Sequence, residues 1–341
     1  MRILFITDPG ILVPPSGYGG IERIVGDLAV EYIKMGCTVD LLTTKGSNIY
    51  GCSVYSIGNA GFPPTKFVMY ASIFKAWFFL LRKNNQYDLI HNFGRLLYLF
   101  PVLKTNTRKI QSYQREITSR NAKMVLKFNP TNLAFTGCSV NLITRANPLG
   151  YWKGIHNCVV FNKFQLTYSI NILDAPLVFL GRIERIKGCH TAIEVAKITG
   201  RKLLIAGNIS KLPEEIQYFE NEIKPHVDGI NVEFVGEVND VQKNELLGKS
   251  AAFLMPIEWN EPFGIVMIEA MACGTPVIAF PYGSVPEVIE EGITGFVVQD
   301  RQEMIDAVSK INEIDRCLCR QTAERRFDVS VIAKQYLSLF E

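Results

Sequence analysis

Two carboxylates in EPFGIVMIEAMACGTPVIAF, residues 261–280, have a spacing that suits sugar-nucleotide chemistry. Glu261 precedes a Pro-Phe-Gly turn, a helix is expected to begin at Ile265, and Glu269 then lies about one turn inside that helix. A helix N-terminus presents free backbone N–H groups and is a natural phosphate site. Carboxylates accept hydrogen bonds from vicinal hydroxyls, so this pair could bracket a sugar nucleotide. Taken singly, a helix cap for Glu261 and a surface position for Glu269 are the commoner interpretations.

Two cations lie in FLGRIERIKG, residues 179–188. This segment follows an expected strand, so Arg182 and Lys187 fall at the carboxyl end of that strand or in the next loop, where open α/β sheets bind ligands. Arginine binds phosphate through a planar fork and lysine as a point charge. Together they could hold a diphosphate and stabilise it as it leaves. The alternative is two unrelated surface cations.

A glycine-rich loop, PPSGYGGIE at residues 14–22, joins the first expected strand to the first helix. Its glycines, Gly19 and Gly20 among them, allow the backbone to approach a ligand closely. A dinucleotide-binding domain is the obvious alternative. However, Glu22 stands where the last glycine of GxGxxG belongs, and the second strand ends in Thr44 rather than in an acid that could hold a ribose.

Apolar runs typical of strands alternate with helical stretches in both halves of the chain, and this pattern predicts parallel sheets covered on both faces. The fold class is therefore α/β, with two doubly wound Rossmann-like domains at residues 1–168 and 169–324 and a C-terminal helix at about 325–341 that packs back on the first domain. The expected strands are 2–7, 38–44, 88–93, 109–113, 176–182, 202–208, 231–237, 251–256, 275–280 and 295–298.

Length and composition agree with a folded two-domain protein. The 341 residues exceed one typical domain, and 48% hydrophobic with 20% charged residues is typical of globular chains. Residues 1–7 are apolar but too short for a secretory signal, and turn residues follow them at once. The eight cysteines are scattered without a CxxC pair, which indicates reduced thiols and a cytoplasmic location.

The net charge of +3 conceals an asymmetry between the halves. Residues 1–170 carry 19 Lys and Arg against 7 Asp and Glu, whereas residues 171–341 carry 17 against 26. The basic half either is neutralised by the other domain or meets an anionic acceptor or membrane surface. In a helix, Arg120, Lys123 and Lys127 would lie near one face and contribute to such a surface.

The segment FVMYASIFKAWFFLL, residues 67–81, is apolar on nearly every side. A membrane-spanning helix needs about 20 such residues, so this one is too short. We expect a helix packed in the core of the first domain. An interfacial helix lying on a membrane is the alternative, because Lys66, Arg82 and Lys83 flank the segment.

The motifs, in this order and spacing, resemble the family-four retaining glycosyltransferases, and most of all the avilamycin-pathway (AviGT4-like) subgroup, which opens with PPxGYGGIE. The resemblance covers nearly the whole chain and includes DLIH at 88–91, FVGEV at 234–238 and GSVPEVIEEGITGF at 283–296. It implies the GT-B fold, in which two domains face each other across a cleft. It also implies retaining transfer of a hexose from a nucleotide sugar, with UDP-glucose as the expected donor, to an unidentified acceptor.

The resemblance assigns roles to the motif residues. Arg182 and Lys187 would bind the donor diphosphate and, with Glu261, form the catalytic group. Glu269 would bind the ribose of the nucleotide, and Val238 would lie near the base. The backbone that would hold the transferred sugar and approach the donor belongs to Gly19, Gly20, Phe263, Gly264, Ile265 and Val266.

The acceptor side departs from the family pattern. Many relatives place a histidine after the strand that here reads KIQSYQRE, but this chain has Gln114 at that place, followed by Arg115. The familiar N-G-V-D is replaced by residues 162–165, which read NKFQ. His91 either takes over the role of the missing histidine or is a buried structural residue. Acceptors of other members are therefore not carried over.

No DxD sequence occurs, so we expect no metal and no other cofactor, with leaving-group charge met by cations and helix-terminal amides. The expected partners are the nucleotide-sugar donor, the acceptor and the surface of an anionic membrane, and no nucleic acid. Two other functions stay open. One is a non-catalytic nucleotide-sugar-binding subunit, which the absent histidine favours. The other is a different enzyme of the same architecture, such as an epimerase or a sugar phosphorylase.

Overall fold

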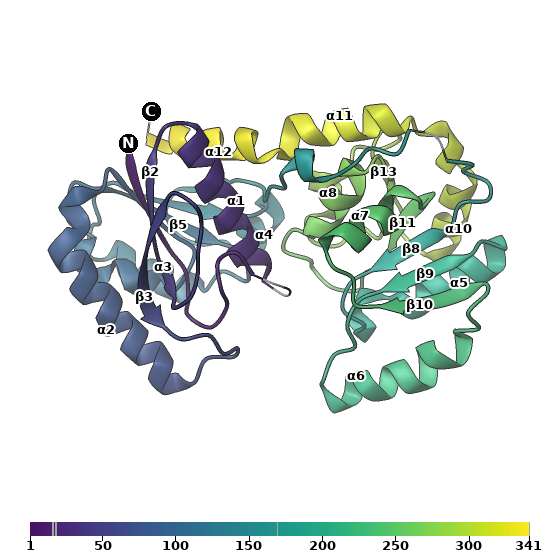
Figure 1. Cartoon of the computed structure of the whole chain (residues 1–341), viewed down its shortest axis with the longest axis horizontal. Helices are drawn as coiled ribbons and strands as arrows, with labels where there is room; N and C mark the ends of the chain where they lie inside the picture. Colours follow the sequence, from purple (N-terminus) through teal and green to yellow (C-terminus); the bar gives the residue numbers. More distant parts are fainter. Residues whose placement is uncertain (16, 18, 169, 341) are drawn as a thin grey trace. The chain divides into compact units, whose positions relative to one another are not determined.

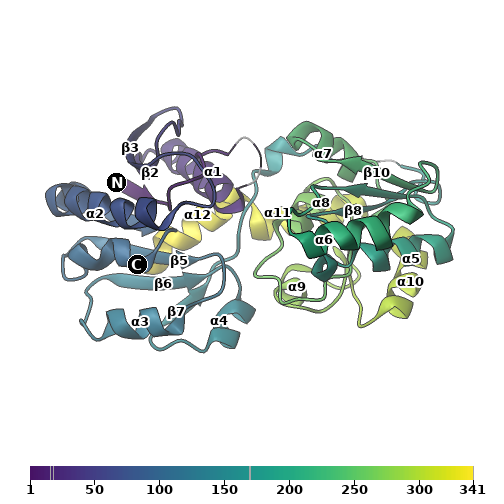
Figure 2. The ribbon, with the colours of Figure 1, turned by 90° about the horizontal axis from the view of Figure 1, so that it is seen from below.

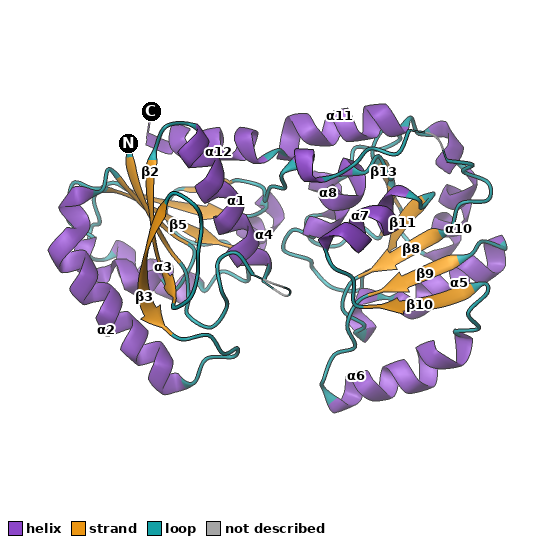
Figure 3. Cartoon of the chain, in the orientation of Figure 1, coloured by secondary structure: helices purple, strands orange, loops and turns teal. Residues whose placement is uncertain are grey.

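The computed structural model describes residues 1–15, 17, 19–168 and 170–340. It divides into two compact units, Met1–Cys158 with Val329–Glu341, and Val159–Asp328. The sequence placed this boundary at 168/169. Each unit is built on a parallel sheet with helices on both faces (Figures 1 and 3), so the predicted α/β class with two doubly wound units is confirmed.

The first unit holds a seven-stranded sheet in the order β3-β2-β1-β4-β5-β6-β7. The sequence predicted β1, β2, β4 and β5, which form the buried centre, but gave no strand for β3, β6 and β7. These three are half-exposed or short, so their apolar pattern is weak. The strands are β1 Arg2–Ile6, β2 Thr38–Thr44, β3 Cys52–Gly58, β4 Leu89–Asn92, β5 Arg108–Tyr113, β6 Leu133–Gly137 and β7 Trp152–Gly154.

Helices cover both faces of this sheet, as Figure 2 shows from below. Alternate residues of β1 point to opposite faces: Leu4 joins the core beneath α2 and α3, whereas the Phe5 ring stacks on Tyr32 of α1 at 5.8 Å. The C-terminal helix packs beside α1, where the Tyr32 hydroxyl donates to the Ala333 carbonyl at 3.3 Å. The helices are α1 Gly20–Lys34, α2 Lys66–Lys83, α3 Ser119–Leu126, α4 Val140–Ala146 and α12 Val329–Leu337.

The second unit holds a six-stranded sheet in the order β10-β9-β8-β11-β12-β13, and each of its predicted strands is found. Because these strands are parallel, the loops after β8, β9, β10, β11 and β12 meet at one edge of the sheet. The strands are β8 Leu177–Leu180, β9 Leu203–Ala206, β10 Val232–Gly236, β11 Ala252–Met255, β12 Val277–Ala279 and β13 Gly295–Val297. The helices are α5 Cys189–Thr199, α6 Pro213–Tyr218, α7 Asp240–Gly248, α8 Ile265–Ala272, α9 Val285–Val288, α10 Arg301–Ser309 and α11 Arg316–Phe327.

The expectation that residues 67–81 form a core helix is only half right. α2 buries Ser72, Ile73, Ala76 and Leu80 against the sheet, but the opposite side of the helix is apolar and exposed to solvent. Both sides of one helix can be apolar while the fold covers only one of them. Within the described ranges, no helix is both long enough and apolar enough to cross a membrane.

Candidate functional site

Glu261 and Lys187 form an ion pair in the second unit, although they lie far apart in the sequence. The Lys187 ammonium nitrogen is 2.5 Å from Glu261 Oε2, and the side chains are 17% and 14% exposed. The Trp259 indole donates to the same carboxylate oxygen at 3.1 Å, and its ring lies 4.6 Å from the Lys187 ammonium. The carboxylate is thus held from two sides by groups that come from the loops after β8 and β11.

Glu269 is the second motif carboxylate, and it is buried, with 4% of the residue exposed. Its partner is Lys243 of α7, whose ammonium bonds directly to the carboxylate. The alternative of a surface position for Glu269 is therefore wrong. A buried carboxylate needs a counter-charge, and Lys243 supplies it while remaining 14% exposed itself.

Lys243 was missed by sequence reasoning. It lies one turn into α7, whose start is fixed by a capping box in which Asn239 and Gln242 exchange bonds at 3.0 Å. The same loop carries Val238, which is half-buried just after β10. The capping signature in FVGEVNDVQK and the position after a strand could have identified Lys243, because they place a cation at the binding edge of the sheet.

The helix after Glu261 begins where the sequence predicted. Gly264 is its N-cap with φ of 75°, a left-handed conformation that favours glycine, and α8 starts at Ile265. Phe263 points its ring into the core, 6.0 Å from Phe327, so only its backbone faces the loop. Ile265 and Val266 are the first two residues of α8, and their amides have no partner within the helix. A helix N-terminus of this kind suits an anion.

The loop that carries Glu261 is braced by the turn after β12. A Cβ on Gly283 would come within 2.2 Å of the Glu261 carbonyl oxygen, so only glycine allows this approach. Ser284 completes the contact: its N–H donates to the Glu261 carbonyl at 3.0 Å, and its hydroxyl donates to the Phe263 carbonyl at 2.7 Å. The segment GSVPEV thus positions Glu261 and the start of α8.

Arg182 follows β8 and is paired with Glu184 at 2.7 Å; the arginine side chain is 43% exposed and the glutamate 7%. The loop continues to Lys187 and then to Gly188, where a Cβ would come within 1.9 Å of the Pro256 carbonyl oxygen. This close approach fixes the loop after β8 against the segment after β11. Arg182 keeps an accessible guanidinium, and Lys187 is held at Glu261.

The second unit thus presents three cations, Arg182, Lys187 and Lys243, each against a carboxylate. Without ligand the ion pairs balance the charge. A diphosphate would offer Arg182 and Lys187 stronger acceptors and free Glu261 to accept from hydroxyls, while Lys243 stays paired with Glu269. This chemistry fits a sugar nucleotide, in which a diphosphate lies between two polyols.

The first unit contains a separate cavity of about 430 Å³, beside the loop after β1 and the start of α1. Polar groups line it: Asp8 pairs with Arg95 at 2.5 Å, and Glu22 is nearly buried. Burial raises the pKa of Glu22, and Asp8 adds to this, while Arg115 opposes it. The predicted acceptor-side residues Gln114 and Arg115 both line this cavity.

Gln114 is the strongest ligand signal in the first unit. Among the residues that the structure describes, neither its amide nitrogen nor its amide oxygen has a hydrogen-bond partner although both are buried, and the neighbouring Tyr113 hydroxyl is also unpartnered. Buried polar atoms without partners are costly, so they point to a missing ligand that can both donate and accept. Hydroxyl groups of a sugar have this property.

Gly19 and Gly20 begin α1, in the same unit. Gly19 has φ of 149°, and a Cβ there would come within 2.8 Å of Pro15 Cβ and 2.9 Å of Ile11 Cγ2. Its conformation and surroundings therefore both require glycine. Gly17 shows no such restriction, because none of the described residues beyond its chain neighbours comes within 4 Å of a Cβ there.

His91 does not line the cavity. It lies fully buried on β4, with its ring 4.3 Å from Phe93 and 4.5 Å from Tyr336, and its Nε2 bonds to the Ser112 hydroxyl at 2.8 Å. Burial lowers the pKa of His91 well below its usual value. The structure favours a structural histidine over a replacement for the missing acceptor-side residue.

Comparison with known families matches residues 173–325 to the family model described as glycosyl transferases group 1. Among curated proteins, the phosphatidyl-myo-inositol mannosyltransferase of Mycobacterium leprae is 30% identical over 131 residues, which are 36% of this chain and 35% of that protein. The alpha-maltose-1-phosphate synthase of Mycobacterium tuberculosis is 30% identical over 182 residues, 48% of this chain and 46% of that protein. The chain spans about half or less of the length of these relatives.

Solved structures match the chain over almost its whole length. The avilamycin A biosynthesis glycosyltransferase AviGT4 is 22% identical with a TM-score of 0.73, covering 99% of this chain and 96% of that one. The Anabaena protein HepE in complex with UDP-glucose is 18% identical with a TM-score of 0.72, covering 99% and 98%. At these identities the likeness establishes the GT-B fold, and the subgroup stays a prediction.

Proposed function

We propose that this chain, whose residues 173–325 match the family model described as glycosyl transferases group 1, is a glycosyltransferase that moves a hexose from a nucleotide sugar to an acceptor with retention. The observation that carries the proposal is two ion pairs, Lys187 with Glu261 and Lys243 with Glu269, whose side chains are at most 17% exposed and lie at the edge of the second sheet where ligands bind. These groups suit a diphosphate flanked by two polyols.

The donor is held, in this proposal, by Arg182, Lys187 and the first amides of α8 on the diphosphate, and by Glu269 on the ribose. Lys243 orients the Glu269 carboxylate so that its oxygens accept from both ribose hydroxyls. Val238 lies beside the base, and Glu261 with the backbone of residues 263–266 holds the transferred sugar. UDP-glucose is our donor, which the HepE complex supports by likeness of fold alone.

Departure of the nucleoside diphosphate builds negative charge on the leaving phosphate. Arg182 and Lys187 are fixed before the reaction, and fixed charges of this kind are worth about 3 kcal/mol of transition-state stabilisation for each group removed. The leaving phosphate oxygen can take the proton of the acceptor hydroxyl on the same face. The transfer then needs neither a metal ion nor a dedicated protein base.

The acceptor is assigned to the cavity of the first unit, with Gln114 and Arg115 as its ligands. Arg120, Lys123 and Lys127 support an anionic acceptor, because α3 is a helix and all three side chains are exposed along it. With a soluble anionic acceptor, the Michaelis constant should rise steeply with salt, since the screening length falls from about 30 Å at 0.01 M to about 10 Å at 0.1 M. Changing the three cations to glutamine should flatten that dependence.

We place the enzyme in the cytoplasm, peripherally at a membrane, and the absence of disulfide bonds among the described cysteines supports a reducing compartment. A second candidate, a donor-binding subunit without activity, is favoured by Gln114 in place of the acceptor-side histidine. The two functions differ in turnover. An inactive subunit would bind nucleotide sugars tightly without releasing nucleoside diphosphate.

The test is a panel of nucleotide sugars incubated with the protein, with free nucleoside diphosphate as the readout, with and without hydroxyl acceptors. We expect slow hydrolysis of one donor, accelerated by an acceptor, with the product keeping the anomeric configuration in its NMR spectrum. Binding without any release supports the inactive subunit. Interconversion of sugars on the intact nucleotide indicates an epimerase, and phosphate-dependent cleavage indicates a phosphorylase.

A further inference from the structure

α2 carries a stripe of exposed apolar side chains that the fold leaves uncovered. Exposed fractions along it are 82% for Phe67, 62% for Tyr70, 65% for Phe74, 57% for Phe78 and 66% for Leu81. Successive members are three or four positions apart, so the side chains lie along one face of the helix. Single exposed apolar residues are ordinary, but a continuous row of five large ones needs an occupant.

The opposite face of the same helix is already used. Ser72, Ile73, Ala76 and Leu80 are buried against the first sheet, and the Trp77 indole donates to the Leu97 carbonyl at 2.8 Å. α2 is therefore held firmly in the fold and presents its outer face as a rigid surface. A helix that is apolar all round is normally enclosed on all sides, and this one is enclosed on one side only.

Charge around the stripe has one sign. The eighteen residues of α2 include no aspartate or glutamate, and Lys66, Lys75 and Arg82 flank the exposed aromatic rings. The Arg82 guanidinium lies 3.7 Å from the centre of the Phe78 ring, so cation and aromatic share one patch. The unit as a whole carries 19 Lys and Arg against 8 Asp and Glu.

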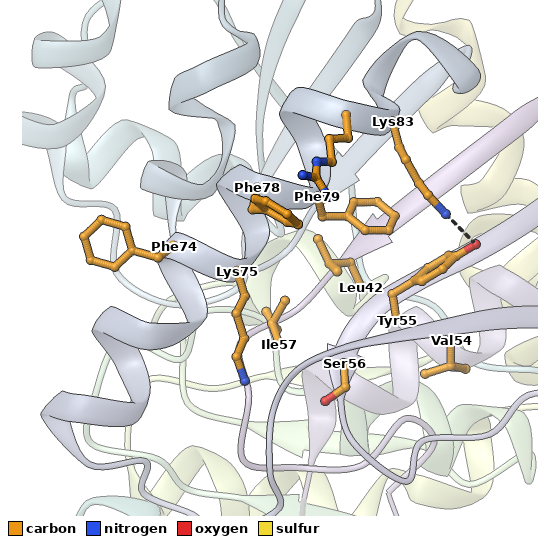
Figure 4. Close-up of a pocket in the computed structure, with 11 residues that line it drawn as sticks. Leu42, Val54, Tyr55, Ser56, Ile57, Phe74, Lys75, Phe78, Phe79 and Lys83 are labelled. Atoms are coloured by element: carbon orange, nitrogen blue, oxygen red, sulfur yellow. Dashed lines mark hydrogen bonds between the residues drawn. The ribbon is translucent and has the colours of Figure 1, made fainter.

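A groove of about 630 Å³ runs between α2 and the edge strand β3, next to the stripe. Figure 4 shows its lining, with Leu42 and Ile57 in its floor and the rings of Phe78 and Phe79 above them. Two lysines lie at its rim, Lys75 on one side and Lys83 on the other. The Lys83 ammonium donates to the Tyr55 hydroxyl at 3.4 Å. An apolar hollow with a cationic rim fits an acyl chain whose headgroup is anionic.

We propose that the outer face of α2 docks on an anionic lipid bilayer. The aromatic stripe enters the interfacial layer, Lys66, Lys75 and Arg82 contact the headgroups, and the groove beside β3 accepts the end of an acyl chain. Aromatic side chains and cations of this kind are favoured at the boundary between headgroups and hydrocarbon. The proposal is independent of the sugar chemistry and does not need the function argued above.

A second copy of the chain fits the face less well. In a twofold dimer the same patch meets itself, so Lys75 and Arg82 of one copy would face the cations of the other. Like charges at an interface cost binding free energy, whereas an anionic surface neutralises them. Charge therefore selects the bilayer over self-association.

The test is sedimentation of the protein with vesicles of phosphatidylcholine alone and of phosphatidylcholine mixed with phosphatidylglycerol. We expect binding to the mixed vesicles and far weaker binding to the neutral ones. The variant Phe74→Ser/Phe78→Ser should bind roughly tenfold less tightly or weaker, since two exposed rings no longer insert. The variant Lys75→Gln/Arg82→Gln should bind about 25-fold less tightly, at about fivefold for each cation.

Matched controls separate α2 from the general charge of the unit. Tyr151→Ser removes a ring that is 77% exposed elsewhere in the first unit, and Lys34→Gln/Lys334→Gln removes two exposed cations from α1 and α12, on the other face of the first sheet. Both controls should bind like the unaltered protein. Every replaced side chain is exposed, and an unchanged melting temperature checks that the fold is intact.

Several outcomes would overturn the proposal. These are no binding to either vesicle, equal binding to both, or equal loss in the Lys34→Gln/Lys334→Gln control and the α2 charge variant. Concentration-dependent dimers in sedimentation velocity that Phe74→Ser/Phe78→Ser abolishes would assign the face to a second copy instead. None of these results bears on nucleoside diphosphate release, so the proposed function is judged separately.

Discussion

Replacing Lys243 with methionine leaves the Glu269 carboxylate without its counter-charge in a site where that side chain is only 6% exposed. Removing one partner of a buried ion pair costs about 3–5 kcal/mol, because the remaining charge stays desolvated. The second unit spans Val159–Asp328, a size at which 1 kcal/mol corresponds to about 2–4 °C in melting temperature. We therefore expect the transition of this unit to fall by about 10 °C.

The double variant Lys243→Met/Glu269→Gln should recover much of that loss, since no charge is left buried alone. The assay is urea unfolding of the unaltered protein, both single variants and the double variant, which together form a double-mutant cycle. We expect a coupling free energy of about 2 kcal/mol.

Two results would refute this reasoning. A change of less than about 1 kcal/mol in Lys243→Met would mean that Glu269 is solvated or otherwise paired. Strict additivity in the cycle would mean that the two side chains do not interact. In either case Lys243 would lose its role of orienting the ribose-binding carboxylate.

Three further expectations concern catalysis and pH. Lys187→Ala and Arg182→Ala should each lower turnover about 100-fold with the fold intact. The control Arg185→Ala should change turnover little, because this cation is on the same loop but pairs with a glutamate outside the site. Equal losses in all three variants would contradict the assignment of Lys187 and Arg182 to the diphosphate. Activity should survive EDTA, and complete loss reversed by Mn²⁺ or Mg²⁺ would disprove metal independence. Burial lowers the pKa of Lys109 to about 8, below its value in the unfolded chain. The free energy of unfolding of the first unit should therefore rise between pH 8 and pH 10 relative to that of Lys109→Met. Parallel stability profiles of the two proteins over this pH range would contradict the prediction.

The centre of the fold was predictable because buried parallel strands read as continuous apolar runs. RILFI and LVFL are examples, and both form strands fully or nearly buried within their sheets. β3 was not predicted, because an edge strand with a half-exposed pattern has little signal in the sequence. For a related reason the sequence left residues 67–81 open between a core helix and an interfacial one: periodicity cannot tell which of two apolar faces the fold will cover.

The candidate site was predictable wherever a backbone constraint left its mark in the sequence. Gly264 is required by its left-handed conformation, and Gly283 by its close approach to the Glu261 backbone. Both glycines lie in motifs that stand out in the sequence. For Lys243 the mark is weaker: the capping signature places a cation after β10, but a lysine on a helix still looks like any solvated cation. Its role emerges only when the fold sets it beside Glu269, 26 residues further along the chain.

Calorimetric titration of the protein with UDP-glucose and with UDP tests the central claim most directly, because both carry the diphosphate that the second unit is proposed to hold. We expect saturable binding of both at one site per chain, without added metal, and a loss of about tenfold or more in Lys187→Ala but not in Arg185→Ala. Other nucleoside diphosphates, titrated in parallel, identify the preferred base. If no nucleoside diphosphate binds, or if Lys187→Ala binds as tightly as the unaltered protein, the assignment of the ion-paired edge of the second sheet as a donor site is contradicted.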